Sequence, residues 1–222
     1  MKPTDCPPNA EERARDLLRS YGRTYAREAG IRLTDQPSAL YQLLVLATLL
    51  SARISPGIAV VAARELFTAG YRTPAAMIEA TWQDRVDALG RGHYRRYDES
   101  TARMLGDGAG HVIRQYEGDL RRLSDKADGD ADGIAGLLEE FPGIGPAGAG
   151  IYLREVQDAW PSVAPYVDDW MTEGARRAGL PADRDDLAAL LTETGQPSRL
   201  AAALVRFSHA RNPSQGKTAR ES

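Results

Sequence analysis

Prolines and glycines divide this chain into short segments, and this division constrains the fold more than any other feature of the sequence. Pro37, Pro56 and Pro74 each begin a stretch of helical length, and proline suits the first turn of a helix. Thr73 is a suitable N-cap before Pro74, and Gly70 follows a helical stretch as glycine often does. No alternating apolar and polar pattern is long enough to predict a sheet. The sequence therefore predicts an all-α fold of short helices joined by brief loops.

The individual helices are predicted from apolar spacing and from helix breakers. The stretch from Ala39 to about Arg53 is apolar almost all round, so we expect it to be central. Thr81 and Asp84 resemble a capping box at the start of another helix. Residues 90–98 form a basic and aromatic loop, and residues 124–133 form a polar turn. The other helices are expected over 10–28, 56–69, from about 98 to Tyr116, 134–140, 147–158, 168–178, 184–193 and 198–210.

The composition is that of an ordinary soluble protein, with 222 residues of which 42% are hydrophobic and 27% charged. The longest apolar stretch, residues 43–50, has the length of a core helix and is too short to span a membrane. The N-terminal residues show no apolar signal segment, so we expect a cytoplasmic, nucleoid-associated protein without a membrane partner. Residues 1–9 are expected to be a flexible arm and residues 212–222 a disordered tail.

Cysteine and histidine are too sparse to predict a metal centre or an internal disulfide. Cys6 is the single cysteine, and the three histidines are scattered along the chain. The net charge of −3 provides no general attraction to nucleic acid, so the distribution of basic residues matters more than their sum. Arginine dominates these residues, since the lysines are only Lys2, Lys126 and Lys217.

Residues 141–150, FPGIGPAGAG, predict a tight turn between two helices. Pro142 blocks the first helix, Gly143 and Gly145 permit positive φ, and Pro146 suits the first turn of the second helix. A helix N-terminus beside bare glycine amides is a good seat for phosphate. We predict that this seat comprises Pro142, Gly143, Ile144, Gly145 and Ala147. The alternative is a simple interhelical turn, which also favours proline and glycine.

The order P-G-I-G resembles the helix-hairpin-helix DNA-binding motif, and two other stretches extend the resemblance. LLSAR at 49–53, the hairpin, and YVDDW at 166–170 occur in the order and approximate spacing of the endonuclease III-like DNA glycosylases, and SHAR at 208–211 is similar to their closing helix. The resemblance covers roughly residues 10–211. It implies a two-lobed helical bundle in which both termini contribute to one lobe, with a cleft that receives a base flipped from duplex DNA. It also implies a lesion-bearing or mismatched duplex as partner, and we expect a monomer.

The resemblance implies that Asp168 is the catalytic carboxylate, with Asp169 as its rival because the register is uncertain by one residue. Breaking an N-glycosidic bond gives the sugar oxocarbenium character, which a carboxylate stabilises. Both residues also suit a helix N-cap, which is compatible with a catalytic role.

Family members that also cut the DNA strand use a lysine after the hairpin, which forms a Schiff base with the sugar. Ala147 occupies that position here, so the resemblance implies a glycosylase without efficient lyase activity. Many members also carry an iron–sulfur cluster on four cysteines after the closing helix. No cysteine follows Cys6, so we expect no iron–sulfur cluster and no other cofactor.

The remaining DNA-facing candidates lie at 53 and 91–97. Arg53 aligns with a family residue that fills the gap left by the flipped base, although an ordinary helix-end arginine is an alternative. Arg91, His93 and Tyr94 lie near the family's second wedge, within a loop that interleaves cations and aromatic rings. A solvated charged turn is the alternative for this loop. Trp82 and Trp160 are expected in the core or at helix ends, whereas Trp170 is also a candidate for a base pocket.

These patterns support three readings of function. The favoured one is a DNA repair glycosylase that removes a damaged or mismatched base without cutting the strand. The first alternative is a non-catalytic helix-hairpin-helix protein that binds DNA by its structure. The second is a helical protein that does not bind DNA, which the net charge of −3 mildly favours.

Overall fold

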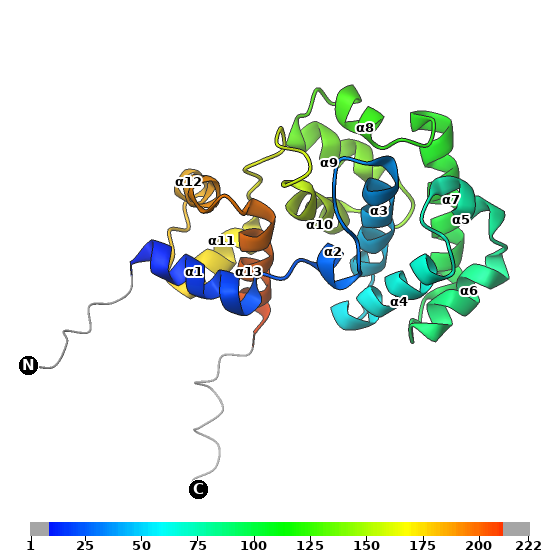
Figure 1. Cartoon of the computed structure of the whole chain (residues 1–222), viewed down its shortest axis with the longest axis horizontal. Helices are drawn as coiled ribbons and strands as arrows, with labels where there is room; N and C mark the ends of the chain where they lie inside the picture. The colour runs from blue at the N-terminus through cyan, green and yellow to red at the C-terminus, as the bar shows by residue number, and fades with distance from the viewer. Residues whose placement is uncertain (1–8, 211–222) are drawn as a thin grey trace, which may run out of the picture.

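The computed structural model describes residues 9–210, and this part of the chain consists of helices and loops without a strand (Figure 1). The all-α prediction is therefore confirmed. The expected N-terminal arm, apart from residue 9, and the expected tail lie outside the described residues. The helices are α1 Ala10–Tyr21, α2 Tyr25–Glu28, α3 Pro37–Ser51, α4 Pro56–Thr68, α5 Pro74–Glu79, α6 Trp82–Arg91, α7 Asp98–Tyr116, α8 Arg121–Lys126, α9 Ala131–Glu139, α10 Pro146–Val156, α11 Asp169–Ala178, α12 Arg184–Thr194 and α13 Pro197–His209.

Most helix starts follow the local signals in the sequence. Proline occupies the first turn of α3, α4, α5 and α10, as predicted. The Thr73 hydroxyl accepts a hydrogen bond from the Ala76 amide at 3.2 Å. Thr81 and Asp84 form the predicted capping box, in which each side chain accepts from the other residue's amide.

Two predicted boundaries are wrong. The helix expected over 10–28 is broken, because Gly22 ends α1 and the Thr24 hydroxyl caps a separate α2. A Cβ at Gly22 would lie 2.3 Å from the Leu18 carbonyl oxygen, so only glycine fits this turn. The polar turn expected over 124–133 is shorter, because α8 extends to Lys126 and the Asp130 carboxylate caps α9 through the Gly133 amide at 2.7 Å.

The buried apolar residues form two clusters. The larger one gathers residues from α2 to α10 around α3, which is buried on nearly every side as predicted. The smaller one gathers α1 with α11, α12 and α13, so residues from both ends of the described chain pack together (Figure 1). Among the described residues, no helix is both long and apolar enough to cross a bilayer.

Helix α10 connects the two clusters, since it contacts α3 and α9 on one side and α13 on the other. Its Glu155 side chain is buried and accepts hydrogen bonds from the Tyr25 and Ala26 amides, each at 2.9 Å, at the start of α2. Burial raises the pKa of Glu155, although these two amide hydrogen bonds oppose the rise. From α13, Arg206 reaches α2 and pairs with Glu28 at 2.9 Å. The Glu155 contacts therefore fix α10 against α2, and the ion pair joins α2 to α13 of the smaller cluster.

Candidate nucleic-acid interface

The hairpin between α9 and α10 is built partly as predicted. Gly143 has φ of +85°, which favours glycine, whereas Gly145 does not use the freedom that glycine permits and is extended, with φ of −117°. The prediction that Ile144 contributes to the phosphate seat is wrong. Its side chain is buried, and its amide donates to the Phe141 carbonyl at 3.0 Å. Ile144 therefore anchors the turn in the core.

The amides that remain for an anion are those at the start of α10. Within residues 9–210, the amides of Gly145, Ala147 and Gly148 donate to no carbonyl, and Pro146 has no N–H. Ala147 is exposed and Gly145 half-buried. Unpaired amides and the helix dipole together favour a negative charge at this end.

Two glycines of α10 let two different groups approach the helix closely. A Cβ at Gly148 would lie 2.3 Å from the Ser51 Oγ of α3. A Cβ at Gly150 would lie 3.3 Å from an Asp168 carboxylate oxygen. Residues two apart on a helix point in nearly opposite directions, so α3 and Asp168 lie on different sides of the first turns of α10. Residues three, four and seven apart share a face, so Ala147 and Arg154 point to the same side as Gly150.

Asp168 is the N-cap of α11, and both of its carboxylate oxygens are engaged. Oδ1 accepts from the Met171 amide at 3.0 Å, and Oδ2 accepts from the Arg154 guanidinium in an ion pair. The side chains of Arg154 and Asp168 are only 12% and 16% exposed. The capping role considered for Asp168 is therefore confirmed. The Asp168 carboxylate therefore lies between the start of α11, a helix of the smaller cluster, and Gly150 of α10.

The rival carboxylate points elsewhere. The Asp169 side chain is 93% exposed and pairs with Arg184 at 2.6 Å, and Arg184 also donates to the Val167 carbonyl at 2.7 Å. Of the two aspartates, Asp168 is the one directed at α10. The neighbouring Trp170 is 52% exposed and stacks on His209 with ring centroids 5.1 Å apart.

Arg154 is the residue that sequence reasoning missed. It lies seven residues after Ala147, a spacing that places both on one face of a helix. This spacing could have identified Arg154 from the sequence as a neighbour of position 147. The contact with Asp168 also depends on the loop between α10 and α11, where the Gln157 side chain accepts from the Tyr166 amide at 2.7 Å. The sequence does not reveal this loop geometry.

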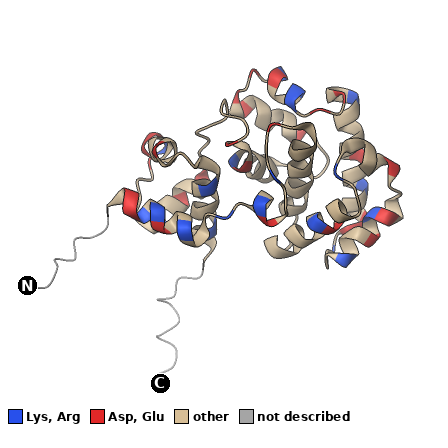
Figure 2. Cartoon of the chain, in the orientation of Figure 1, with Lys and Arg blue, Asp and Glu red and all other residues tan. Residues whose placement is uncertain are grey.

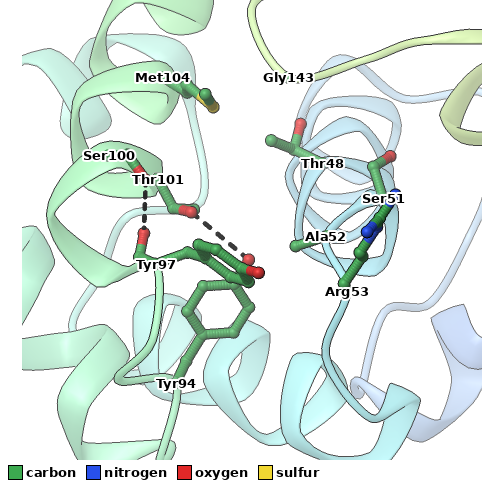
Figure 3. A pocket seen from close by; sticks show the side chains of 10 residues that line it. All are labelled: Thr48, Ser51, Ala52, Arg53, Tyr94, Tyr97, Ser100, Thr101, Met104 and Gly143. Atoms are coloured by element: carbon green, nitrogen blue, oxygen red, sulfur yellow. Dashed lines mark hydrogen bonds between the residues drawn. The ribbon is translucent and has the colours of Figure 1, made fainter.

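Arg53 is exposed just beyond the end of α3, beside a cavity of about 290 Å³ between α3 and the first turns of α7 (Figure 3). Tyr94 lies at the floor of this cavity and is fully buried. The prediction that Tyr94 acts as a wedge into DNA is therefore wrong, because its ring cannot leave the core without disrupting it. Of the two tyrosines in this loop, Tyr97 is the one that is partly exposed, and the Arg96 guanidinium lies 5.2 Å from the centre of its ring.

The other two wedge candidates are at the surface. Arg91 ends α6 and pairs with Glu65 at 3.3 Å, so its charge is partly compensated. His93 is exposed and has φ of +62°. Acidic and basic residues are interspersed over most helices in the view of Figure 2.

The other two tryptophans have the structural settings expected of them, one in the core and one at a helix start. His111 lies against Phe141, with ring centroids 4.6 Å apart. Trp160 is buried, and Trp82 is at the start of α6. Across residues 9–210, no three His, Cys, Asp or Glu side chains gather in a way that could hold a metal ion.

Comparisons with known proteins give similarity of structure only. No family model matches the chain, and no curated protein matches it. Two solved structures are similar to it in overall fold: a trapped covalent intermediate of endonuclease III with DNA, in an estranged-adenine complex, and a non-covalent endonuclease III–DNA complex. Each is 19% identical to this chain with a TM-score of 0.48, over 90% of this chain and 86% of the other.

Proposed function

We propose that this protein is a DNA glycosylase that hydrolyses the N-glycosidic bond of a damaged or mismatched base in duplex DNA and leaves the strand intact. The observation that carries the proposal is the position of Asp168. Its carboxylate faces Gly150 of α10, and the free amides at the end of the hairpin lie in the first turn of the same helix. A fixed carboxylate beside a seat for phosphate is what base removal from a DNA strand requires.

The chemistry assigns separate tasks to these two features. The hairpin amides bind a backbone phosphate and position the strand without reading its sequence. The target base leaves the stack, so its sugar comes within reach of a protein side chain. As the bond to the base breaks, the sugar becomes positively charged, and the Asp168 carboxylate stabilises that charge and orients the attacking water.

The absence of lysine at 147 supports base removal without strand cleavage. Ala147 shares a face with Gly150 and Arg154, so a lysine at this position would point towards Asp168. Alanine cannot form a Schiff base. Lys126, the lysine within the described residues, lies on α8, with its ammonium 5.9 Å from the centre of the Tyr116 ring. The proposed enzyme needs neither a lysine nucleophile nor an iron–sulfur cluster.

A second function is favoured by one specific observation. Both oxygens of Asp168 already accept hydrogen bonds, and the Arg154 guanidinium compensates the carboxylate charge. A carboxylate in this setting can have a purely structural role, because it caps α11 and pairs with Arg154. The alternative is therefore a protein that binds DNA through the hairpin without acting on it. Arg53 and the exposed arginines of the 91–97 loop would serve either function as contacts to the duplex.

The test is a cleavage assay on duplexes that carry a panel of lesions and mismatches, each incubated with and without hot alkali. The proposal predicts strand breaks on at least one substrate only after alkali, which reveals abasic sites. Asp168→Asn should abolish these breaks and retain DNA affinity. Salt-dependent binding without breaks on any substrate would favour the non-catalytic alternative. Breaks without alkali would show that another amine performs lyase chemistry.

A further inference from the structure

Met104 is the methionine of the described chain that a dissolved oxidant can reach. The residue lies on α7 and is 36% exposed, whereas Met77 and Met171 are each 0% exposed. Met1 lies outside the described residues. Access of the oxidant to the sulfur decides which thioether becomes a sulfoxide. Within residues 9–210, Met104 is therefore the expected site of methionine oxidation.

The Met104 sulfur also supports the turn of the hairpin. A Cβ added to Gly143 would lie 2.9 Å from the Met104 Sδ and 3.3 Å from the Thr48 Cγ2. Figure 3 shows Met104 on α7 and Thr48 on α3, both near Gly143. The backbone of the turn therefore packs on a sulfur from one helix and a methyl group from another.

This packing matters because the turn has few hydrogen bonds of its own. Among the amides of residues 143–145, the Ile144 amide is the one that donates to a backbone carbonyl within the described chain, that of Phe141 at 3.0 Å. On its other side, Met104 lines a small internal cavity of about 10 Å³ together with Phe141 and Pro142. Met104 thus contacts the hairpin surroundings over several consecutive residues, and apolar packing holds the turn in place.

Oxidation changes the size and the polarity of this support. When the sulfur reacts with a peroxide, an S–O bond forms, the O–O bond breaks, and the second peroxide oxygen leaves as water. The sulfur is oxidised and the peroxide is reduced. A soft, flexible thioether becomes a polar, chiral sulfoxide. If the new oxygen faces Gly143, it pushes the turn away; if the side chain rotates into water, Gly143 loses that contact. Both outcomes loosen the turn.

The turn leads directly into the amides that are proposed to bind phosphate. The free amides of Gly145, Ala147 and Gly148 follow Gly143 within five residues. An anion at a helix N-terminus is held by several amides that point at it together, so a displaced turn weakens the contact.

We propose that Met104 is a modification site, at which oxidation by a peroxide loosens the hairpin and weakens DNA binding. The inference rests on the proposed binding of DNA through the hairpin amides, and it adds a redox control to that surface. The control is reversible, because methionine sulfoxide reductases return a sulfoxide to the thioether.

The test treats the chain with hydrogen peroxide and follows three quantities in each sample. Peptide mass spectrometry measures the oxidation of each methionine, hydrogen exchange measures the opening of residues 141–148, and equilibrium titration measures affinity for a duplex with a tetrahydrofuran abasic site. Every protein carries Cys6→Ser, so that the single cysteine does not react. Met104 should be oxidised at least about tenfold faster than Met77 and Met171.

The expected changes follow from the loss of one contact. The Ile144 amide should exchange about tenfold faster after oxidation, because local opening of the turn becomes easier. Affinity for the duplex should fall by about tenfold, which corresponds to one hydrogen bond to a charged phosphate. Treatment with methionine sulfoxide reductases should restore both values.

Three variants make the result specific. Met104→Leu keeps an apolar side chain of similar volume, so it should bind DNA as the wild type does and lose the response to peroxide. Met104→Gln places a polar group of similar length there and should weaken binding without peroxide. Met77→Leu is the matched control: it makes the same exchange at a buried methionine and should leave the response to peroxide unchanged.

The outcomes separate this inference from the proposed function. Oxidation of Met104 without a change in exchange or affinity, or an equal loss of affinity in Met104→Leu, would overturn the inference and leave the glycosylase proposal standing. A loss of affinity that Met104→Leu prevents would support the inference even if no substrate is ever cleaved. Absence of salt-dependent DNA binding before any treatment would overturn both.

Discussion

Uncoupling Arg154 from Asp168 tests the central feature of the site, a carboxylate held between a helix cap and an ion pair. The two side chains are 12% and 16% exposed, so the pair differs from surface pairs, which contribute about 0–1 kcal/mol. At an effective dielectric constant of about 20, two unit charges about 4 Å apart attract by roughly 4 kcal/mol, and desolvation removes part of this. A hydrogen bond to a charged group contributes about 1.5–3 kcal/mol net.

Arg154→Gln should therefore lower the free energy of unfolding by about 2–3 kcal/mol. Asp168→Asn should cost a similar amount, because it leaves the Arg154 charge uncompensated, although the asparagine oxygen can still cap α11 through the Met171 amide. The double variant should lose less than the sum of the two, with a coupling energy of about 1–2 kcal/mol.

Urea unfolding of the four proteins at neutral pH, followed by circular dichroism, measures this cycle. Arg176→Gln is the matched control, because Arg176 pairs with Glu173 at the surface of α11 and its loss should change stability by less than about 0.5 kcal/mol. A coupling energy near zero would refute the reasoning, since it would mean that the two charges contribute independently.

The same variants separate the two residues in activity. Arg154→Gln should retain excision, because the Met171 amide still holds the Asp168 carboxylate through Oδ1. Asp168→Asn should lose excision, because the charge that stabilises the sugar cation is gone. Equal loss in both variants on every cleaved substrate would contradict the assignment of the two roles.

Three further outcomes follow from single positions. Ala147→Lys should give strand cleavage without alkali and an adduct that borohydride traps, both measured on denaturing gels, whereas the wild-type chain should give neither. Gly148→Ala should lower the free energy of unfolding by about 1–3 kcal/mol because its Cβ meets the Ser51 Oγ, and adding Ser51→Ala should restore most of the loss in thermal unfolding. Burial raises the pKa of Glu155 above the usual 4.5, so the stability linked to its protonated form is present below that value and is lost as pH rises through the folded-state pKa. The stability of the wild-type chain relative to Glu155→Gln should therefore fall as the pH rises above the usual carboxyl pKa of 4.5 in urea titrations, and a flat difference would contradict this linkage.

The parts of the fold that could be predicted from sequence are those decided by neighbouring residues. Thr73 before Pro74, and Thr81 with Asp84, each place a helix start within a few positions, because a cap bonds to amides two or three residues away. The break at Gly22 was missed, because it depends on a close approach between Gly22 and the Leu18 carbonyl that the spacing of apolar residues does not reveal.

The candidate site divides in the same way. The sequence pointed to Asp168 as a group at a helix start, and the structure shows it there. It did not indicate that Arg154 donates to the second carboxylate oxygen of Asp168. That contact depends on the path of the loop between α10 and α11, which the spacing of apolar residues does not predict. The prediction for Tyr94 in the 91–97 loop was wrong for a related reason. A tyrosine among arginines is typical of a surface, whereas Tyr94 is buried between helices.

The capping role of Asp168 decides how its proposed chemistry can be tested at all. A change to alanine would remove the charge and the cap together, and loss of an N-cap alone costs about 1 kcal/mol and loosens the start of α11. Loss of activity in such a variant would fit a structural role as well as a catalytic one. Asparagine keeps an oxygen for the Met171 amide and removes only the charge. If Asp168→Asn binds DNA as the wild type does but no longer excises, the missing charge is responsible; if the wild type itself never excises, the carboxylate serves only to cap α11 and pair with Arg154.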